Sequence, residues 1–285
     1  MKAHAIRGPL LGRLGGSRIV SISSGLLLCI ALIAILGPLV SPHAYQDVNL
    51  DQRLLPPTLD NYRWFGTDDL GRDLFVRSMM GVRVSLLVAI VASAVSLVIG
   101  VFYGAVAGYV GGRVDAVMMR IVDILYALPF IFFVILLMVY FDRNFFLIFV
   151  AIGAINWLDM ARIVRGQTLA LKEREFVDAA RVAGVRPLAI VRRHITPNLL
   201  GVVLVYVTLT VPQAMLMESF LSFLGLGVQE PETSLGSLVN GGVRQMERAA
   251  WVLLIPASLL AFVLLCFNFM GDGLRDVLDP RAGHR

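Results

Sequence analysis

Residue types that could perform catalysis are few in this sequence and lie far apart. Neither of the two cysteines, Cys29 and Cys266, stands at metal-ligand spacing from any of the four histidines. The sequence contains no GxxxxGK[ST] phosphate-binding loop, and its only lysines are Lys2 and Lys172. No nucleophile and base converge in one segment. We therefore predict no catalytic residue, no metal and no cofactor in this chain, so any energy source lies elsewhere.

Three carboxylates nevertheless lie inside apolar runs, where a charge costs at least ~2.5 kcal/mol and faces a partner or a cavity. They are Asp123, Asp159 and Glu218. Two interpretations of Glu218 stay open: a position at a subunit interface or translocation pathway, and a polar staple between helices. For Asp159, near the cytoplasmic end of its apolar run, the staple is favoured.

The elements that position these residues are membrane helices. The chain is 58% hydrophobic and 16% charged, with a mean hydropathy of +0.79, and one span needs ~20 apolar residues. We predict an all-α membrane protein with six transmembrane helices, at residues 20–41, 84–109, 117–140, 144–163, 200–225 and 249–270. The first run is expected to be a retained helix, because it is long and no small-x-small cleavage site follows it.

The distribution of basic residues predicts the orientation of these spans. With alternating spans, 17 of the 25 Lys and Arg residues fall on one side, which is expected to be the cytoplasm. Both termini, in tails 1–19 and 273–285, and the loop 164–199 are then cytoplasmic, whereas the loops 42–83 and 226–248 are extracytoplasmic. The net charge of +5 reflects this topology, and no nucleic-acid partner is expected because the basic residues flank membrane helices.

A polar segment, Glu175–Asn198, interrupts this apolar chain. Its first part is predicted to be an amphipathic helix that Gly184 ends, and Pro187 begins a second helix. We expect Pro197 to close the unit. The segment is predicted to form a compact knob at the cytoplasmic face, called the knob below. Four apolar residues of its first helix have the spacing i, i+3, i+4 and i+7 and therefore share one face: Phe176, Ala179, Ala180 and Ala183.

The knob carries a resemblance to a known family. Asp178-Ala179-Ala180, Gly184 and Pro197 resemble the EAA loop of ABC importer permeases, with aspartate for the usual glutamate and Thr196 for the usual leucine. Further motifs resemble the C-type permease of dipeptide and oligopeptide importers, and one of them is especially similar to the oligopeptide branch. These are Phe65–Asp73, Glu218–Gly227 and Gly271–Asp276, with Trp157–Gln167 as the oligopeptide-like motif. The resemblance covers roughly residues 20–281.

The resemblance implies a type I ABC importer permease fold, with its permease domain at residues 84–272, in the cytoplasmic membrane of a prokaryote. It implies that this chain forms a heterodimer with a B-type permease in the lipid bilayer. It also implies that an extracytoplasmic peptide-binding protein is a partner. Two ATPase subunits would bind ATP and Mg and push on the knob. The expected contacts with these ATPases are Phe176, Asp178, Ala179, Ala180, Gly184 and Pro197.

Two further groups of residues have a predicted position. Asp68, Asp69, Arg72 and Asp73 are candidate contacts at the outer mouth, although pairing among themselves, or with the B-type permease, is favoured. Gly100, Gly104 and Gly108, at four-residue intervals, predict close packing of helices more than contact with the substrate.

Three alternatives stay open at this stage. The nearest is a permease subunit for nickel or another small solute, because the knob and the outer-loop motif are shared. A second is a self-standing channel or ion-coupled carrier, which the knob disfavours. For the knob alone, the alternative is an amphipathic helix that lies on lipid headgroups.

Substitutions in the knob test its coupling role. Replacing Gly184 by a bulky residue, or Asp178 by Lys, should leave the protein inserted but separate ATP hydrolysis from transport, because the docked contact is lost. ATPase and uptake measurements on the same vesicles check this expectation. Normal uptake by both variants would contradict the coupling assignment.

Overall fold

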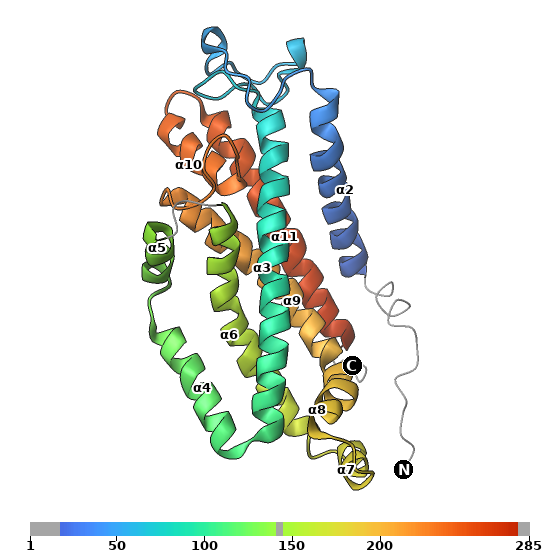
Figure 1. Cartoon of the computed structure of the whole chain (residues 1–285). Helices are drawn as coiled ribbons and strands as arrows, with labels where there is room; N and C mark the ends of the chain where they lie inside the picture. Colours follow the sequence, from blue (N-terminus) through green and yellow to red (C-terminus); the bar gives the residue numbers. More distant parts are fainter. Residues whose placement is uncertain (1–17, 141–144, 279–285) are drawn as a thin grey trace.

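The computed structural model describes residues 18–140 and 145–278, which form an elongated bundle of helices (Figure 1). The helices are α2 (Arg18–Val40), α3 (Leu74–Val110), α4 (Gly112–Ala127), α5 (Phe130–Tyr140), α6 (Phe145–Leu171), α7 (Glu175–Val182), α8 (Pro187–Ile190), α9 (Thr196–Phe223), α10 (Leu235–Gln245) and α11 (Ala250–Leu278). Of the predicted tails, residues 1–17 and 279–285 lie outside the described residues.

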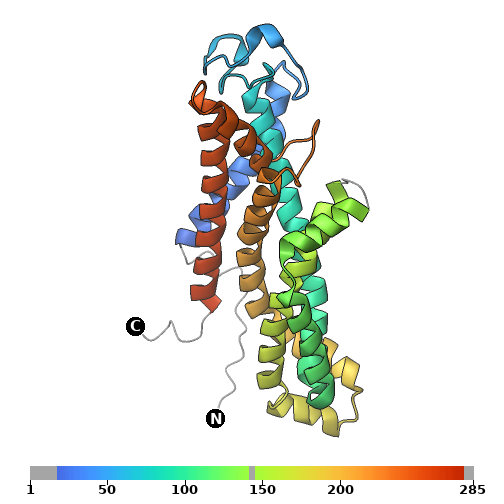
Figure 2. The same cartoon turned by 90° about the vertical axis from the view of Figure 1, so that its left-hand side faces the viewer.

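The bundle has two different ends. The loop between α2 and α3 lies at one end, close to α10, and α7 and α8 lie at the other (Figures 1 and 2). The loop contains the short 3-10 helices Leu50–Gln52 and Asp60–Tyr62. Helix α2 begins, and α11 ends, toward the α7–α8 end.

Helix α3 is the centre of the packing, and α6 is its most extensive partner. Gly100, Gly104 and Gly108 are buried along this contact. A Cβ at Gly100 would lie 2.6 Å from the Cβ of Met160, and one at Gly108 would lie 2.8 Å from the carbonyl oxygen of Arg165. The absence of side chains therefore lets the two backbones approach closely.

Four helical segments in the described part of the chain are long and apolar enough to cross a membrane, or five if a bent pair counts as one span. The four are Arg18–Val40, Leu74–Val110, Pro187–Phe223 and Ala250–Asp276, and the bent pair joins α4 to Ile131–Leu137 at 85°. Helix α6 covers the segment predicted as a span at 144–163, apart from residue 144. The count of six spans stays a prediction.

Three helices are longer than the hydropathy pattern indicates, and one of them is α6, which continues to Leu171, past the predicted boundary at 163. Helix α3 begins at Leu74, ten residues before the predicted start of its span, because the side chain of Asp73 caps it by accepting a hydrogen bond from the Val76 N–H at 2.9 Å. With 37 residues, α3 is about 55 Å long and extends beyond a ~30 Å hydrocarbon layer. Helix α11 continues to Leu278, past the predicted boundary at 270.

Two prolines in predicted spans have different effects. Pro129 follows Leu128, whose backbone is extended, and separates α4 from α5 at the sharp bend. Pro212 lies inside α9, where it is buried and the helix continues on both sides. Only the first proline thus accompanies a break in the helix.

The close contact of α3 with α6 predicts that a methyl group added at Gly104 destabilises the protein. Gly104→Ala should lower the free energy of unfolding by roughly 1–3 kcal/mol, because the added methyl group would meet the backbone of Ala161 and Arg165. Gly201→Ala is the matched control, since a Cβ there meets nothing within 4 Å. Thermal unfolding of the purified protein in detergent measures both variants. Equal stability of the two would show that the α3–α6 contact tolerates a wider separation.

Candidate functional site

The knob is built from α7, a glycine turn and α8. Gly184 has φ +74°, and the Val185 N–H donates to the carbonyl of Ala180 at 3.1 Å, the bond that ends a helix in a Schellman motif. Arg186 is extended, and Pro187 occupies the first turn of α8, as the sequence predicts. A residue with a Cβ at Gly184 would be strained, because the left-handed region disfavours it.

The four residues predicted to share one face of α7 are divided between the core and the surface. Val177 and Ala180 are buried, whereas Phe176, Ala179 and Ala183 are exposed. The predicted apolar face is therefore divided, because Val177 replaces Phe176 as the partner of Ala180 in the core. The outward surface also includes two apolar side chains that the sequence reasoning missed, Val182 at 90% and Leu188 at 64% exposure. The sequence could have indicated them, because both are apolar residues within a polar segment.

An apolar cluster joins the knob to the membrane helices. Val177 and Ala180 pack in it with residues of α3, α6, α8 and α9. The other buried members are Ala105, Met160, Val164, Ile190, Val191, Ile195, Leu199 and Val203. Because packed interiors transmit displacement instead of absorbing it, a force on the knob reaches three long helices.

Charged residues on α7 interact within the knob. Arg181 Nη1 donates to Asp178 Oδ1 at 2.9 Å, and its guanidinium lies 5.5 Å from the ring centre of Tyr109 on α3. The hydrogen bond with Tyr109 and the charge of Asp178 raise the pKa of Arg181. Asp178 is exposed and therefore accessible to a partner.

Pro197 does not close the knob, in contrast to the prediction. The chain stays helical from Pro187 to Phe223 through a π-helical turn at Val191–Ile195. In that turn the Thr196 N–H donates to the carbonyl of Val191, five residues back, and Pro197 lies in the first turn of α9. The wider turn accommodates a proline, which has no N–H to donate.

Thr196 lies beside an apolar groove between α3 and the α8–α9 segment. The groove has a volume of about 420 Å³. Its lining is Leu97, Val98, Val101, Phe102, Ala105, Leu188, Val191, Arg192, Thr196, Leu200 and Val203. The hydroxyl of Thr196 thus stands at the position where the family pattern has an apolar side chain.

Glu218 is completely buried and engaged within the chain. Its Oε2 accepts a hydrogen bond from Ser85 Oγ on α3 at 3.1 Å, and its Oε1 accepts one from Ser222 Oγ at 2.6 Å. Ser85 Oγ in turn accepts from the Leu235 N–H at the start of α10. Of the two open interpretations, the geometry corresponds to a polar staple, which here joins α3, α9 and α10.

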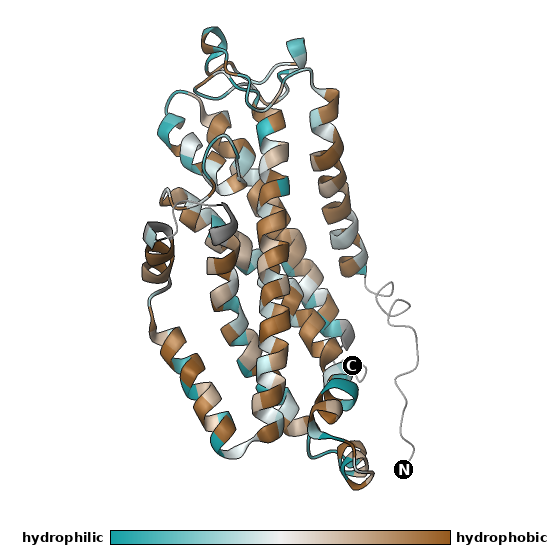
Figure 3. Ribbon diagram, viewed as in Figure 1, coloured by the Kyte–Doolittle hydropathy of each residue, from teal (hydrophilic) through white to brown (hydrophobic). Residues whose placement is uncertain are grey.

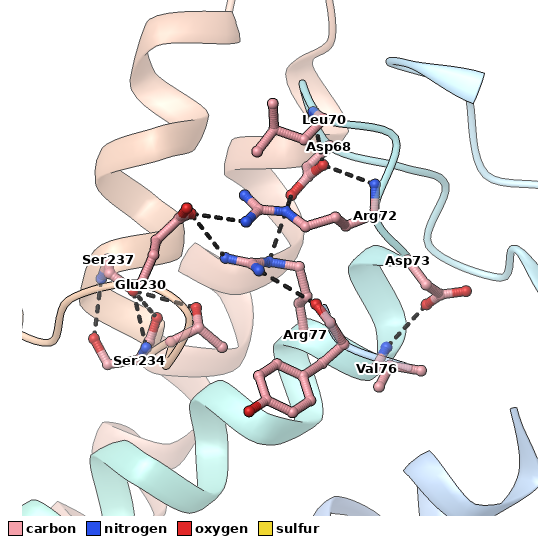
Figure 4. Close-up of polar contacts among 11 residues, drawn as sticks. Asp68, Leu70, Arg72, Asp73, Val76, Arg77, Glu230, Ser234 and Ser237 are labelled. Atoms are coloured by element: carbon pink, nitrogen blue, oxygen red, sulfur yellow. Dashed lines mark hydrogen bonds and ion pairs between the residues drawn. The ribbon is translucent and has the colours of Figure 1, made fainter. Parts of the chain in front are cut away.

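The outer end carries a cluster of charges that is buried apart from Glu230, whose side chain is 62% exposed (Figure 4). Arg72 Nε pairs with Asp68 Oδ2 at 2.7 Å and its Nη1 pairs with Glu230 Oε1 at 2.8 Å. Arg77 approaches the same two carboxylates at 3.4 and 3.6 Å. Burial lowers the pKa of Arg72, but the charges and hydrogen bonds of Asp68 and Glu230 outweigh it and leave that pKa raised. Glu230, 158 residues from Arg72, was not predicted.

The candidate outer-mouth residues therefore differ in accessibility. Asp68, Arg72 and Asp73 are buried, and Asp73 faces Arg63 at 3.5 Å as well as capping α3. Burial raises the pKa of Asp73, against the opposing effects of the Val76 N–H and Arg63. Of these four residues, only Asp69 is partly exposed. Direct contact with a partner stays a prediction, and Asp69 is the residue best placed to make it.

Polar contacts also join α4 to α6. Arg165 binds both carboxylate oxygens of Asp115, with a shortest distance of 2.6 Å, and Arg162 binds Asp123 at 2.9 Å. Asp159 is exposed, and in the described part of the chain it has no hydrogen-bond or ion-pair partner. Asp159 therefore does not form the predicted staple with any of the described helices. Across residues 18–140 and 145–278 no group of three potential metal ligands is found.

Comparison with known proteins gives two matching families. Residues 100–284 match the family described as binding-protein-dependent transport system inner membrane component, and residues 13–57 match the N-terminal TM domain of oligopeptide transport permease C.

Three relatives illustrate the similarity over almost the whole chain. An oligopeptide transport system permease protein OppC of Haemophilus influenzae is 53% identical, over 92% of this chain and 84% of its own length. OppC of Escherichia coli K12 is 55% identical, over 90% and 84%. The dipeptide transport system permease protein DppC of Bacillus subtilis is 46% identical, over 90% and 80%.

A solved structure shares the fold. A chain of the MetNI methionine ABC transporter, in an inward-facing conformation, matches 69% of this chain and 94% of its own with a TM-score of 0.55 and 24% identity. A second crystal form of that transporter matches with the same TM-score. The likeness shows that the helices have the arrangement of an ABC transporter permease.

Replacing a valine by aspartate on the exposed face and on the buried face of α7 should have different effects. Val182→Asp should leave the yield of folded protein unchanged but reduce co-purification of the expected ATPase subunits about tenfold, because a charge replaces an apolar contact. Val177→Asp should instead reduce the yield of folded protein, since it places an unpaired charge in the core. Normal co-purification with the Val182 variant would exclude this surface from docking.

Proposed function

Because this chain belongs to the family of binding-protein-dependent transport system inner membrane components, we propose that it is the permease subunit of an ATP-driven importer of oligopeptides and dipeptides. The observation that carries the proposal is the 53–55% identity with oligopeptide permeases over at least 90% of the chain. The protein is thus a transporter subunit of the bacterial inner membrane.

The energy for transport comes, in this proposal, from separate ATPase subunits. Two such subunits bind ATP and Mg and dock on the knob through Phe176, Asp178 and Ala179, which are exposed. Val182 and Leu188 extend this surface. Of the other predicted contacts, Ala180 supports the surface from the buried side, and Gly184 sets the angle between α7 and α8. The lack of a phosphate-binding loop in the sequence supports this division of labour.

Movement is then transmitted along a defined route. The apolar cluster beneath the knob connects α7 to α3, α6 and α9, and the glycine contact holds α3 against α6. At the other end, Glu218 and the outer charge cluster hold α3 to α9, α10 and the outer loops. A rigid-body rotation of these helices would open one end of the pathway as the other closes.

Orientation and partners follow the same proposal. We place the knob and both termini in the cytoplasm. The charge distribution supports this, and so does the direction of the helices, because α2 begins and α11 ends toward the end of the bundle where α7 lies. A B-type permease completes the pathway, and an extracytoplasmic binding protein delivers the peptide to the outer loops, where Asp69 is accessible.

Transport in a deletion strain tests the substrate. The chain, expressed with its permease, ATPase and binding-protein partners, should restore uptake of labelled oligopeptides in a strain without peptide importers, and should leave nickel uptake at background. Rescue of nickel uptake without peptide uptake would reassign the substrate. Uptake by liposomes that contain this chain without any ATPase would instead indicate a channel or carrier.

A further inference from the structure

Asp159 is an exposed carboxylate on α6, four residues before the end of the predicted span at 163. It lies 12 residues before the end of α6 at Leu171, which corresponds to about 18 Å from that end of the helix. Its neighbours Met160 and Ala161 are buried against α3, so Asp159 points away from that contact. The residues that follow it on the same exposed stripe are Arg162 and Gly166.

The two arginines that follow Asp159 on α6 are already paired with carboxylates. Arg162 pairs with Asp123 at 2.9 Å and also lies 4.5 Å from the ring centre of Tyr126. Arg165 pairs with Asp115 at 2.6 Å. Each arginine next to Asp159 on α6 therefore has its own carboxylate on α4, whereas Asp159 has no ion-pair partner among the described residues. The two arginines of α4 itself, Arg113 and Arg120, are exposed and likewise have no ion pair within the described part of the chain.

This face differs from the surface that suits lipid. The outward stripe of α3 is apolar and exposed, with Leu87, Ile90, Val98 and Phe102. In Figure 3 the middle of α3 is almost uniformly hydrophobic, whereas hydrophilic residues interrupt α4 and α6. An ionised carboxylate is costly in hydrocarbon and is placed toward water or a cation. The stripe of α6 that carries Asp159, Arg162 and Gly166 thus suits a hydrated pathway, although α4 beside it also exposes apolar side chains such as Val117, Ile121 and Ile124.

The charge of Asp159 identifies the ligand chemistry. A linear peptide with a free amino terminus carries an α-ammonium group whatever its sequence, and this group must keep a counter-charge when it leaves bulk water. An exposed carboxylate without an ion-pair partner, next to two arginines that are already paired, can provide that counter-charge through charge-assisted hydrogen bonds.

We propose that Asp159 binds the α-ammonium group of the peptide during its passage, an inference that rests on the proposed peptide transport. Binding through a group common to all linear peptides gives a permease that accepts many sequences. Asp159 is then a specificity-determining residue for a free amino terminus.

Uptake by the complete importer tests this role. Proteoliposomes with all subunits and the binding protein are given trialanine or a tripeptide with a central lysine. Asp159→Asn should lower uptake of both at least about tenfold, the loss expected for a charged hydrogen bond, and Asp159→Glu should retain most of it. Glu247→Gln, a neutralised exposed carboxylate before α11, is the matched control and should transport like the wild type.

A direct contact is measured by zero-length cross-linking. A carbodiimide should join the Asp159 carboxylate to the amino group of trialanine in the wild-type complex, detectable by mass spectrometry, and N-acetyl trialanine should give no such product. The proposal is overturned if Asp159→Asn transports normally, if it affects only the lysine peptide, or if the variant no longer co-purifies with the B-type permease. Absence of peptide uptake by the wild type would instead refute the proposed function.

Discussion

The close contact of α3 with α6 is the constraint on which the other features depend. Three glycines remove the side chains that would hold the backbones apart, and the register of the two helices follows from this contact. Helix α6 leads directly into the knob, whereas α3 carries Ser85 and Arg77 toward the outer end. A change in the position of α6 would therefore displace the knob, Glu218 and the outer charge cluster together.

The sequence predicts the features that depend on local patterns. Apolar runs indicate the membrane helices, Gly184 and Pro187 indicate the turn of the knob, and the family motifs indicate the importer class, which the relatives confirm. The apolar spacing on α7 does not identify its buried side, because on a helix of eight residues several apolar faces compete and the surrounding helices decide between them. Pro197 was misjudged because a π-helical turn leaves no clear periodic signal.

Long-range charge pairing lies beyond such patterns. Glu230 meets Arg72 across 158 residues, and no local spacing indicates this. The same applies to Glu218, whose two interpretations differ only in what surrounds it. Burial and three serine hydroxyls nearby place it among the helices of this chain. Asp159 shows the reverse: a carboxylate expected to join helices remains open to its surroundings.

The π-helical turn at Val191–Ile195 has a further consequence. It contains one residue more than an α-helical path of the same length, and each residue of an α-helix turns the chain by about 100°. The faces of α8 and α9 are thereby offset from one another by that angle, although the helix is continuous. The turn thus sets how the proposed docking surface on α7 and α8 is oriented relative to α9, independently of the length of either helix.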